Sequence, residues 1–172
     1  MAEPLAFAFD PARCSGCLAC VVACLDQNDL PAADLSFRRV TRIERGQGPG
    51  AVLAFVSLAC HHCGDAPCLK ACPAGALSKR EEDGVVVVDP DRCLGCRCCL
   101  LTCPFGAPRF PDGIKMAKCD FCRSRLEAGR EPACVRVCPT GALTFGPLTE
   151  LSRRKVEQRS RILLDSLPDP LS

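Results

Sequence analysis

Seventeen cysteines occur in this chain of 172 residues, and sixteen of them fall into four groups of related spacing. The first and third groups follow the pattern C-x2-C-x2-C-x3-C, and the second and fourth keep its two ends and lengthen its middle. The groups are Cys14, Cys17, Cys20 and Cys24; Cys60, Cys63, Cys68 and Cys72; Cys93, Cys96, Cys99 and Cys103; and Cys119, Cys122, Cys134 and Cys138. Without its cysteines the chain has only a thin apolar core, so the fold must be one that brings these thiols together.

Three kinds of chemistry use cysteines at this density. A disulfide scaffold is disfavoured, because the count is odd and no secretory signal precedes the cysteines. Zinc sites use CxxC pairs closed by a second pair or by His, not an even triplet followed by a fourth cysteine. The observed run is that of bacterial ferredoxins. The spacing therefore predicts four [4Fe-4S] clusters, with a zinc-stabilised interaction module as the alternative from another class.

The spacing has a geometric reason. A tight loop can offer three thiolates to one cube when every third residue points inward. The fourth cysteine starts a short helix and ligates the other cluster of a pair in two-cluster ferredoxins. A proline follows the second, third and fourth groups and ends that helix. Spacing alone leaves open whether the first group pairs with the second or with the fourth.

An internal duplication supports this interpretation. Residues 9–24 and 88–103 are identical at eight of sixteen positions, including the four cysteines and Asp10/Asp89. CPAGAL (72–77) and CPTGAL (138–143) match at five of six. The sequence therefore predicts an α+β fold, with tandem bacterial dicluster-ferredoxin-like modules of short strands and helices spanning residues 1–147.

The hydrophobic pattern predicts the local elements. An inserted hairpin at 35–58 turns at GQGPG and has a basic first strand; it is either solvated or docks a partner. Residues 148–172 are expected to form a helix over 148–164 and an extended tail, with the helix packing on its own domain or contacting a partner. Short strands are expected at 5–9, 85–88 and 143–145, and short helices at 20–24, 67–72, 99–103 and 132–138.

A few residues have more than one possible role. Cys98 breaks the register of the third group and is expected to be a small buried residue, with a substitute ligand as the alternative. His61 and His62 lie inside a group that already has four cysteines, so His ligation is disfavoured. Lys70 and Arg97 are either cations that tune the clusters or solvated surface residues. We expect backbone amides to donate to sulfur around three glycines: Gly16, Gly75 and Gly95.

Composition excludes several functions. The longest uncharged apolar run, 51–60, is half of what a membrane span needs. No GxGxxG motif is present, and a net charge of +2 does not indicate a nucleic-acid binder. Four cores of charge 2+, each with four thiolates, would bring the net charge to about −6. The reduced thiols and the lack of a leader at 1–5 predict a cytoplasmic protein.

These motifs resemble the iron–sulfur electron-transfer subunits of the dimethyl sulfoxide reductase, formate dehydrogenase and polysulfide reductase superfamily; similar subunits serve tungsten aldehyde oxidoreductases. The resemblance covers residues 7–147 and rests on CHHCGDAPCLKACPAGAL, DGVVVVDPDRCLGCRCCLLTCPFGAPRF and KCDFCRSRLEAGREPACVRVCPTGAL. It implies a non-catalytic subunit that relays single electrons between a molybdopterin or tungstopterin enzyme and a redox partner, in an anaerobic setting. A freely diffusing polyferredoxin is the alternative. Relatives can also be exported folded on a partner's signal.

The resemblance also implies which cysteines share a cluster. It pairs the first group with the fourth, and the second with the third. The four implied sets are Cys14, Cys17, Cys20 and Cys138 (site 1); Cys24, Cys119, Cys122 and Cys134 (site 2); Cys60, Cys63, Cys68 and Cys103 (site 3); and Cys72, Cys93, Cys96 and Cys99 (site 4). The sequence departs from these relatives at Cys98, which is usually aromatic, and it lacks the membrane-anchor helix that some of them carry after the fourth group.

Overall fold

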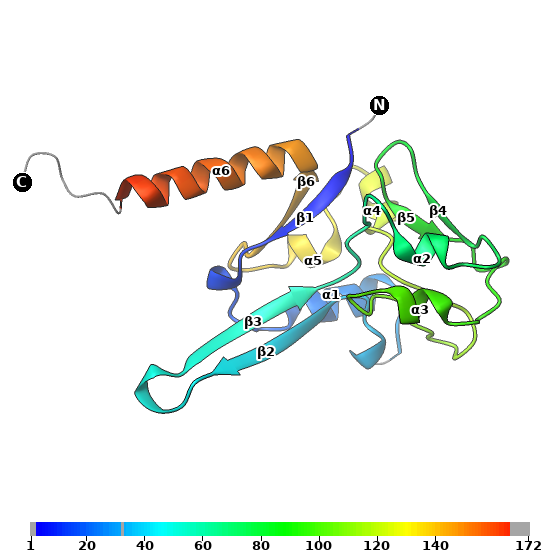
Figure 1. Ribbon diagram of the computed structural model, residues 1–172, viewed down its shortest axis with the longest axis horizontal. Coiled ribbons are helices and arrows are strands. Elements are labelled where there is room, and N and C mark those ends of the chain that lie inside the picture. The colour runs from blue at the N-terminus through cyan, green and yellow to red at the C-terminus, as the bar shows by residue number, and fades with distance from the viewer. Residues whose placement is uncertain (1–2, 32, 166–172) are drawn as a thin grey trace, which may run out of the picture.

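The first and last strands of the molecule, which lie far apart in the sequence, pair with each other (Figure 1). The computed structural model describes residues 3–31 and 33–165, so the tail expected beyond 165 lies outside it. In chain order the helices and strands are β1 (Leu5–Phe9), α1 (Ala19–Gln27), β2 (Arg39–Arg45), β3 (Val52–Leu58), α2 (Pro67–Lys70), β4 (Leu77–Lys79), β5 (Val86–Val88), α3 (Cys98–Thr102), α4 (Arg123–Glu127), α5 (Ala133–Arg136), β6 (Leu143–Pro147) and α6 (Leu148–Asp165).

We call the part built from the two ends of the chain the outer unit. It contains β1, α1, α5 and β6 and carries the first and fourth cysteine groups. Strand β1 runs antiparallel to β6, with Phe9 opposite Leu143, and α1 packs against α5. Cys20, Cys134 and Leu143 form the buried centre of this unit.

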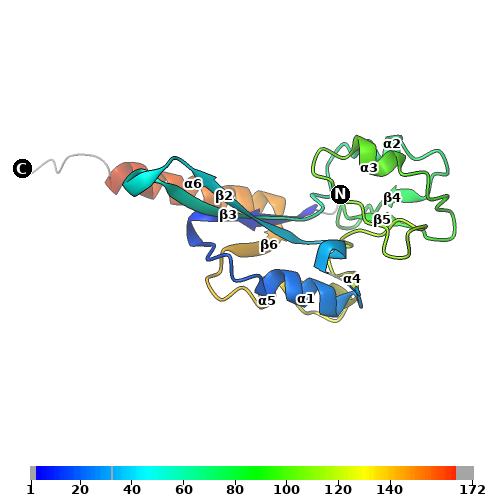
Figure 2. The ribbon, with the colours of Figure 1, turned by 90° about the horizontal axis from the view of Figure 1, so that it is seen from below.

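The inner unit contains α2, β4, β5 and α3 and carries the second and third cysteine groups. Strand β4 runs antiparallel to β5, with Leu77 opposite Val88, and α2 packs against α3. Its core contains Leu77, Val86, Cys99 and Met116. Figure 2 shows α2, α3, β4 and β5 of the inner unit together at one end of the molecule, apart from α1 and α5 of the outer unit.

The duplicated segments begin in the same way. Asp10 and Asp89 each follow a strand, and their side chains accept a hydrogen bond from the amide two residues on, at 3.0 and 2.9 Å. Such Asx turns redirect the chain into the cysteine loop. Leu18 and Arg97, at aligned positions, both have a positive φ near 60° and lead directly into α1 and α3.

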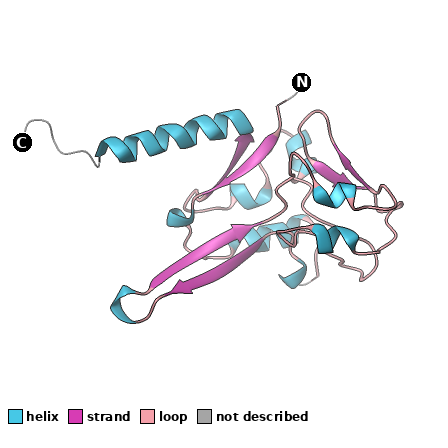
Figure 3. Ribbon diagram, viewed as in Figure 1, coloured by secondary structure: helices cyan, strands magenta, loops and turns pink. Residues whose placement is uncertain are grey.

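Besides the short helix α4, the β2–β3 hairpin and helix α6 lie outside the two units. The hairpin of β2 and β3 pairs over seven residues, from Arg39 opposite Leu58 to Arg45 opposite Val52. Helix α6 begins directly after β6, and its first amide donates to the Pro4 carbonyl at 3.0 Å. Both elements extend from the same side of the molecule (Figures 1 and 3).

The predicted elements appear close to their expected bounds, and the mixed helix and strand content agrees with the α+β prediction. Two expectations need correction. Arg38, which the sequence pattern places with Arg39, Arg42 and Arg45 on the basic face of the hairpin, is not on a surface that could be solvated or dock a partner, because it is 3 % exposed. Cys98, expected to be buried, is partly exposed and starts α3, with its thiol 3.9 Å from the Cys96 carbonyl.

Candidate metal centres

Two equivalent cavities are each lined by four thiols, three from one cysteine group and one from another. In the inner unit, the thiols come from the third group and from Cys72 at the end of the second group. In the outer unit, they come from the first group and from Cys138 at the end of the fourth group. Each cavity is small, with a volume of about 20 Å³. These are the residues of the predicted site 4 and site 1.

Matching backbone contacts hold both cavities together. The Asp10 amide donates to the Ala142 carbonyl at 2.9 Å, and the aligned Asp89 amide donates to the aligned Ala76 carbonyl at 2.8 Å. The duplication thus extends to the contacts between groups. In each unit, a C-x2-C-x2-C-x3-C segment meets a CPxGAL segment.

In each unit, a glycine of the CPxGAL segment lets an arginine of the other segment lie close to the backbone. A Cβ on Gly141 would lie 3.0 Å from the Arg13 guanidinium, and one on Gly75 would lie 2.9 Å from that of Arg92. Arg92 also donates to the Ala74 carbonyl at 3.1 Å. Each arginine of the duplicated motif therefore lies over the CPxGAL turn of the same unit.

The site 2 cysteines are all buried. Burial raises the pKa of the Cys122 thiol to about 11, and the nearby Cys134 and Cys24 thiols raise it further, against the Ala133 amide. Burial also raises the pKa of Cys24, and Cys134 adds to that effect. Burial raises the pKa of Cys119 far above its ordinary value. The Cys134 thiol thus raises the pKa of all three other thiols, which indicates that it lies near each of them.

The site 3 cysteines come from both groups of the inner unit. Burial raises the pKa of Cys68, and the neighbouring Cys60 and Cys103 thiols raise it further. Cys63 packs with Cys68 against the inner core, and Lys79 holds its carbonyl at 3.0 Å. Cys63 and Cys68 therefore pack against the same core, whereas Cys60 and Cys103 are related to Cys68 through its pKa.

Neighbouring sites follow one another through the molecule. The Cys134 thiol of site 2 acts electrostatically on Cys20 of site 1. The Cys60 thiol of site 3 acts in the same way on Cys119 of site 2. Helix α2 carries Cys68 of site 3 and leads directly to Cys72 of site 4. The sets implied by the resemblance therefore neighbour one another in the order site 1, site 2, site 3 and site 4.

The donor atoms suit an iron–sulfur cluster. Among the described residues, no three His, Cys, Asp or Glu side chains converge on a point where a single ion would bind. The thiols of sites 1 and 4 line two small cavities in sets of four. Thiols such as Cys99, whose pKa burial raises to about 11, are neutral until a metal takes the proton's place. Soft thiolates are the ligands that iron–sulfur clusters require.

Backbone amides donate to several of these sulfurs, and one of the donors, Ala76, lies beside Gly75, where such a bond was predicted. The Ala76 amide donates to Cys72 at 3.3 Å, the Ala107 amide to Cys103 at 3.4 Å and the Met116 amide to Cys93 at 3.4 Å. Such bonds favour the charged form of a sulfur and tune the potential of a bound cluster.

The other candidates have ordinary roles in the structure. His61 stacks on Phe105, with ring centroids 4.0 Å apart. His62 is buried and accepts a hydrogen bond from the Val86 amide at 3.0 Å; burial lowers its pKa to about 3. Lys70 is exposed and pairs with Asp65 at 2.6 Å. Arg97 lies over the Phe110 ring at 5.2 Å.

Sequence reasoning missed two buried cations. Arg38 is 3 % exposed and Lys118 is 5 % exposed. Arg38 lowers the pKa of Cys20 and of Cys119, although burial raises both overall. Lys118 precedes Cys119 and acts in the same way on Cys68. The sequence signal was weak, because Arg38 is far from every cysteine in the sequence and approaches Cys20 only through Ser57 of the folded hairpin.

Comparison with known proteins agrees with this geometry. A 4Fe-4S dicluster domain matches residues 51–148. The sequence is 42% identical over 163 residues to the B subunit of the anaerobic dimethyl sulfoxide reductase of Escherichia coli, covering 90% of this chain and 78% of that protein. It is 40% identical over 169 residues to the corresponding subunit of Haemophilus influenzae (92% and 81%), and 38% identical over 168 residues to Protein NrfC of Escherichia coli (92% and 75%).

The fold and its thiol sites define an iron–sulfur protein of the 4Fe-4S dicluster type. The protein belongs to the family of iron–sulfur electron-transfer subunits represented by the B subunits of anaerobic dimethyl sulfoxide reductases. It carries four [4Fe-4S] clusters and transfers electrons, and it is not itself the catalytic component. Iron–sulfur clusters, and not zinc, are therefore its metal groups. Within the described residues, no helix is long and apolar enough to cross a membrane.

Proposed function

We propose that the four clusters are held by the nested ligand sets of sites 1 to 4, so that two ferredoxin-like modules are interleaved in the sequence. The observation that carries this proposal is the pair of cavities in which Cys138 accompanies the first group and Cys72 the third. When bound, [4Fe-4S] clusters accept and release single electrons. The protein's own residues fix the sulfurs, shield them from water and set the charge around them.

Cysteine variants test the nested sets directly. We would compare the anaerobically prepared full-length Cys138→Ser, Cys14→Ser and Cys93→Ser proteins by electron paramagnetic resonance of their reduced clusters. Nested sets predict that Cys138→Ser alters the same signal as Cys14→Ser. Sequential pairing, in which the third group joins the fourth, predicts that it alters the signal of Cys93→Ser instead.

A reciprocal variant covers the case in which Cys138→Ser does not accumulate. Cys72→Ser should alter the signal of Cys93→Ser under nested pairing, and that of Cys14→Ser under sequential pairing. Iron and acid-labile sulfide in the unaltered protein should be close to sixteen of each per chain, as four cubanes require. Stoichiometric zinc without sulfide would contradict the cluster assignment as a whole.

We further propose that the protein is a cytoplasmic subunit, relaying electrons along sites 1 to 4 between a molybdopterin or tungstopterin catalytic subunit and a second redox partner. The hairpin and α6 would form the contact with the catalytic subunit. Both carry apolar side chains that the rest of the protein does not cover, such as Ile43, 47 % exposed, and Val156, 67 % exposed. Val40 and Ser57 of the hairpin also line the site 1 cavity, so a partner bound there would lie near one end of the series.

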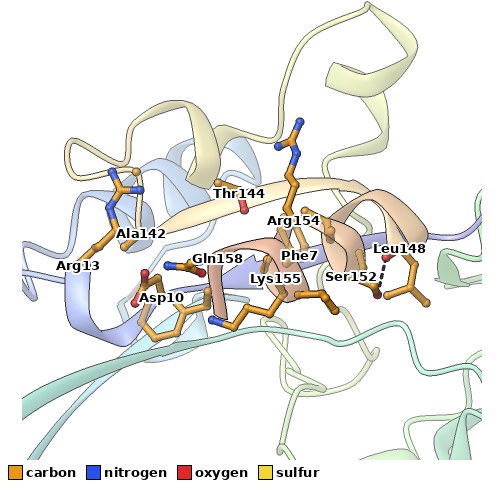
Figure 4. Close-up of a pocket in the computed structure, with 16 residues that line it drawn as sticks. Phe7, Asp10, Arg13, Ala142, Thr144, Leu148, Ser152, Arg154, Lys155 and Gln158 are labelled. Atoms are coloured by element: carbon orange, nitrogen blue, oxygen red, sulfur yellow. Dashed lines mark hydrogen bonds between the residues drawn. The ribbon is translucent and has the colours of Figure 1, made fainter. Parts of the chain in front are cut away.

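A groove beside α6 supports the same proposal. It has a volume of about 770 Å³ and lies between α6 and the sheet of β1 and β6 (Figure 4). Arg13 and Asp10 line it from the side of the outer unit, and Lys155 and Gln158 line it from the helix. Of the described apolar residues of α6, only Leu151 is buried, so most of the helix is not used for packing within the chain.

Surface variants test the contact. The double variant Ile43→Asp/Val156→Asp should keep its iron but lose the subunit that contains molybdenum or tungsten, as measured by metal analysis of the anaerobically isolated complex. The matched control is Leu101→Asp on the inner unit, where Leu101 is 86 % exposed. If only the control loses that subunit, the catalytic partner binds at the site 4 end.

A further inference from the structure

Within the described part of the chain, neither of the two buried cations is balanced by an acidic side chain. Within residues 3–31 and 33–165, the ion pairs join other residues, and neither Arg38 nor Lys118 takes part in one. Arg38 donates to the Ser57 hydroxyl at 3.1 Å, and its Nε is buried without a partner. Lys118 donates to the Val86 carbonyl and to the Cys119 carbonyl, the latter at 3.0 Å. A buried charge without a counter-ion is costly, so a nearby negative charge is required.

The position of Arg38 indicates where that charge lies. Its guanidinium is 4.8 Å from the centre of the Phe7 ring, in the interior of the outer unit. The Ser57 oxygen, which accepts from Arg38, lies 3.8 Å from the Cys20 sulfur. Because Arg38 already donates to this oxygen, the hydroxyl proton is free to point at Cys20. The cation is thus connected to site 1 through one hydroxyl, and its field also reaches Cys119 of site 2.

Lys118 occupies a comparable position between sites 2 and 3. Its ammonium bonds the Cys119 carbonyl, and its field reaches Cys68. A [4Fe-4S] core of charge 2+ with four thiolates has a net charge of −2, and uptake of one electron makes it −3. In a buried, weakly screened environment, a fixed positive charge favours the more negative state. The matching anions for both cations are therefore the cluster sites.

We propose that Arg38 and Lys118 are internal counter-cations that raise the reduction potentials of the clusters beside them, Arg38 at site 1 and Lys118 at site 2. They would be positioning residues, since neither ligates metal. The inference rests on the proposed ligand sets. The alternative is that the potential of a cluster depends on cations close to its ligands in the sequence. In that case, cations between ligand cysteines would change the potentials more than Arg38 does.

The test is a redox titration of the full-length, cluster-loaded protein, followed by electron paramagnetic resonance. Arg38→Met and Lys118→Met should each lower at least one midpoint potential, and the two variants should shift different signals. The matched controls are Arg136→Met and Lys70→Met. Both controls lie between ligand cysteines in the sequence, but they are exposed and lie near Glu131 and Asp65, so their charges are screened. The controls should leave all four potentials unchanged.

If a buried cation is needed for the clusters to bind at all, a variant that keeps the charge still tests the proposal. Arg38→Lys keeps the charge and should preserve iron content and potentials; loss of iron in Arg38→Met with retention in Arg38→Lys also supports the proposal. Full loading of both methionine variants with four unchanged potentials would overturn it. Equal loss of iron in Arg38→Met and Arg38→Lys would overturn it for Arg38, because only shape would then matter. Four intact clusters in the unaltered protein, with ligand sets other than those proposed, would contradict the proposed function separately.

Discussion

The outer and inner units share a duplicated plan but differ in how deeply they bury their cysteines. In the outer unit five of the eight grouped cysteines are buried, and in the inner unit only Cys99 is. The outer unit gains its shielding from distant parts of the chain, because β6 closes it and the hairpin covers it through Phe55 and Ser57. The inner unit is local and leaves apolar side chains exposed, such as Leu94 at 73 % and Leu101 at 86 %. Equivalent ligand patterns therefore do not imply equally protected clusters.

The largest expected effect concerns removal of metal. An anaerobic iron chelator should release about half of the bound iron in a first phase, that of the two inner clusters, because solvent reaches their sulfurs more easily. The measurement is iron release against time, with iodoacetamide labelling and mass spectrometry at the end of the first phase. Label should appear on the second and third cysteine groups. Labelling of the first and fourth groups before the others would contradict the conclusion that the outer clusters are better protected.

A smaller effect is expected from the aligned glycines, both near φ +70°. A Cβ on Gly95 would lie 2.4 Å from the Ile114 carbonyl oxygen, which is backbone, whereas one on Gly16 would meet the Phe55 ring at 2.5 Å. Each alanine in this conformation costs about 1–2 kcal/mol. Gly95→Ala should lower the thermal midpoint of the loaded protein more, because a carbonyl cannot rotate away as a side chain can. Visible cluster absorbance follows the transition.

The control for this pair is Gly50→Ala in the hairpin, where a Cβ meets nothing within 4 Å. It should change the midpoint little. A larger loss for Gly16→Ala than for Gly95→Ala would mean that the Phe55 contact is the more rigid of the two, and that the hairpin is held more firmly than the inner loop.

The smallest effect is expected at the seventeenth cysteine. Cys98→Ser should keep all four clusters and change the free energy of unfolding by less than about 0.5 kcal/mol, since its partly exposed thiol approaches only the carbonyl and the thiol of Cys96, which a serine hydroxyl can also contact. Its aligned partner in the outer unit is Ala19. Iron analysis and the resonance spectrum are the measurements. Loss of about a quarter of the iron would make Cys98 a ligand.

Local features of the structure could be predicted from the sequence. Features that depend on contacts between distant segments could be predicted only in part. The strand and Asx turn before Cys14 follow from alternation and the Asp-Pro pair, so β1 was predicted at its observed bounds. The pairing of β1 with β6 has no local signal, and spacing alone allowed two arrangements of the cysteine groups. The burial of Arg38 was missed because it depends on Phe7 and Ser57, which no periodic pattern in the sequence connects to it.

The pairing of the two chain ends has a consequence for biosynthesis. Ribosomes deliver a chain from its N-terminus at roughly 5–20 residues per second. Strand β1 therefore waits on the order of ten seconds for β6, while every segment of the inner unit has already emerged. During that interval the first cysteine group lacks its closing strand. Nascent chains should accordingly acquire their central metal groups first, and the step that completes the molecule is the arrival of its last strand.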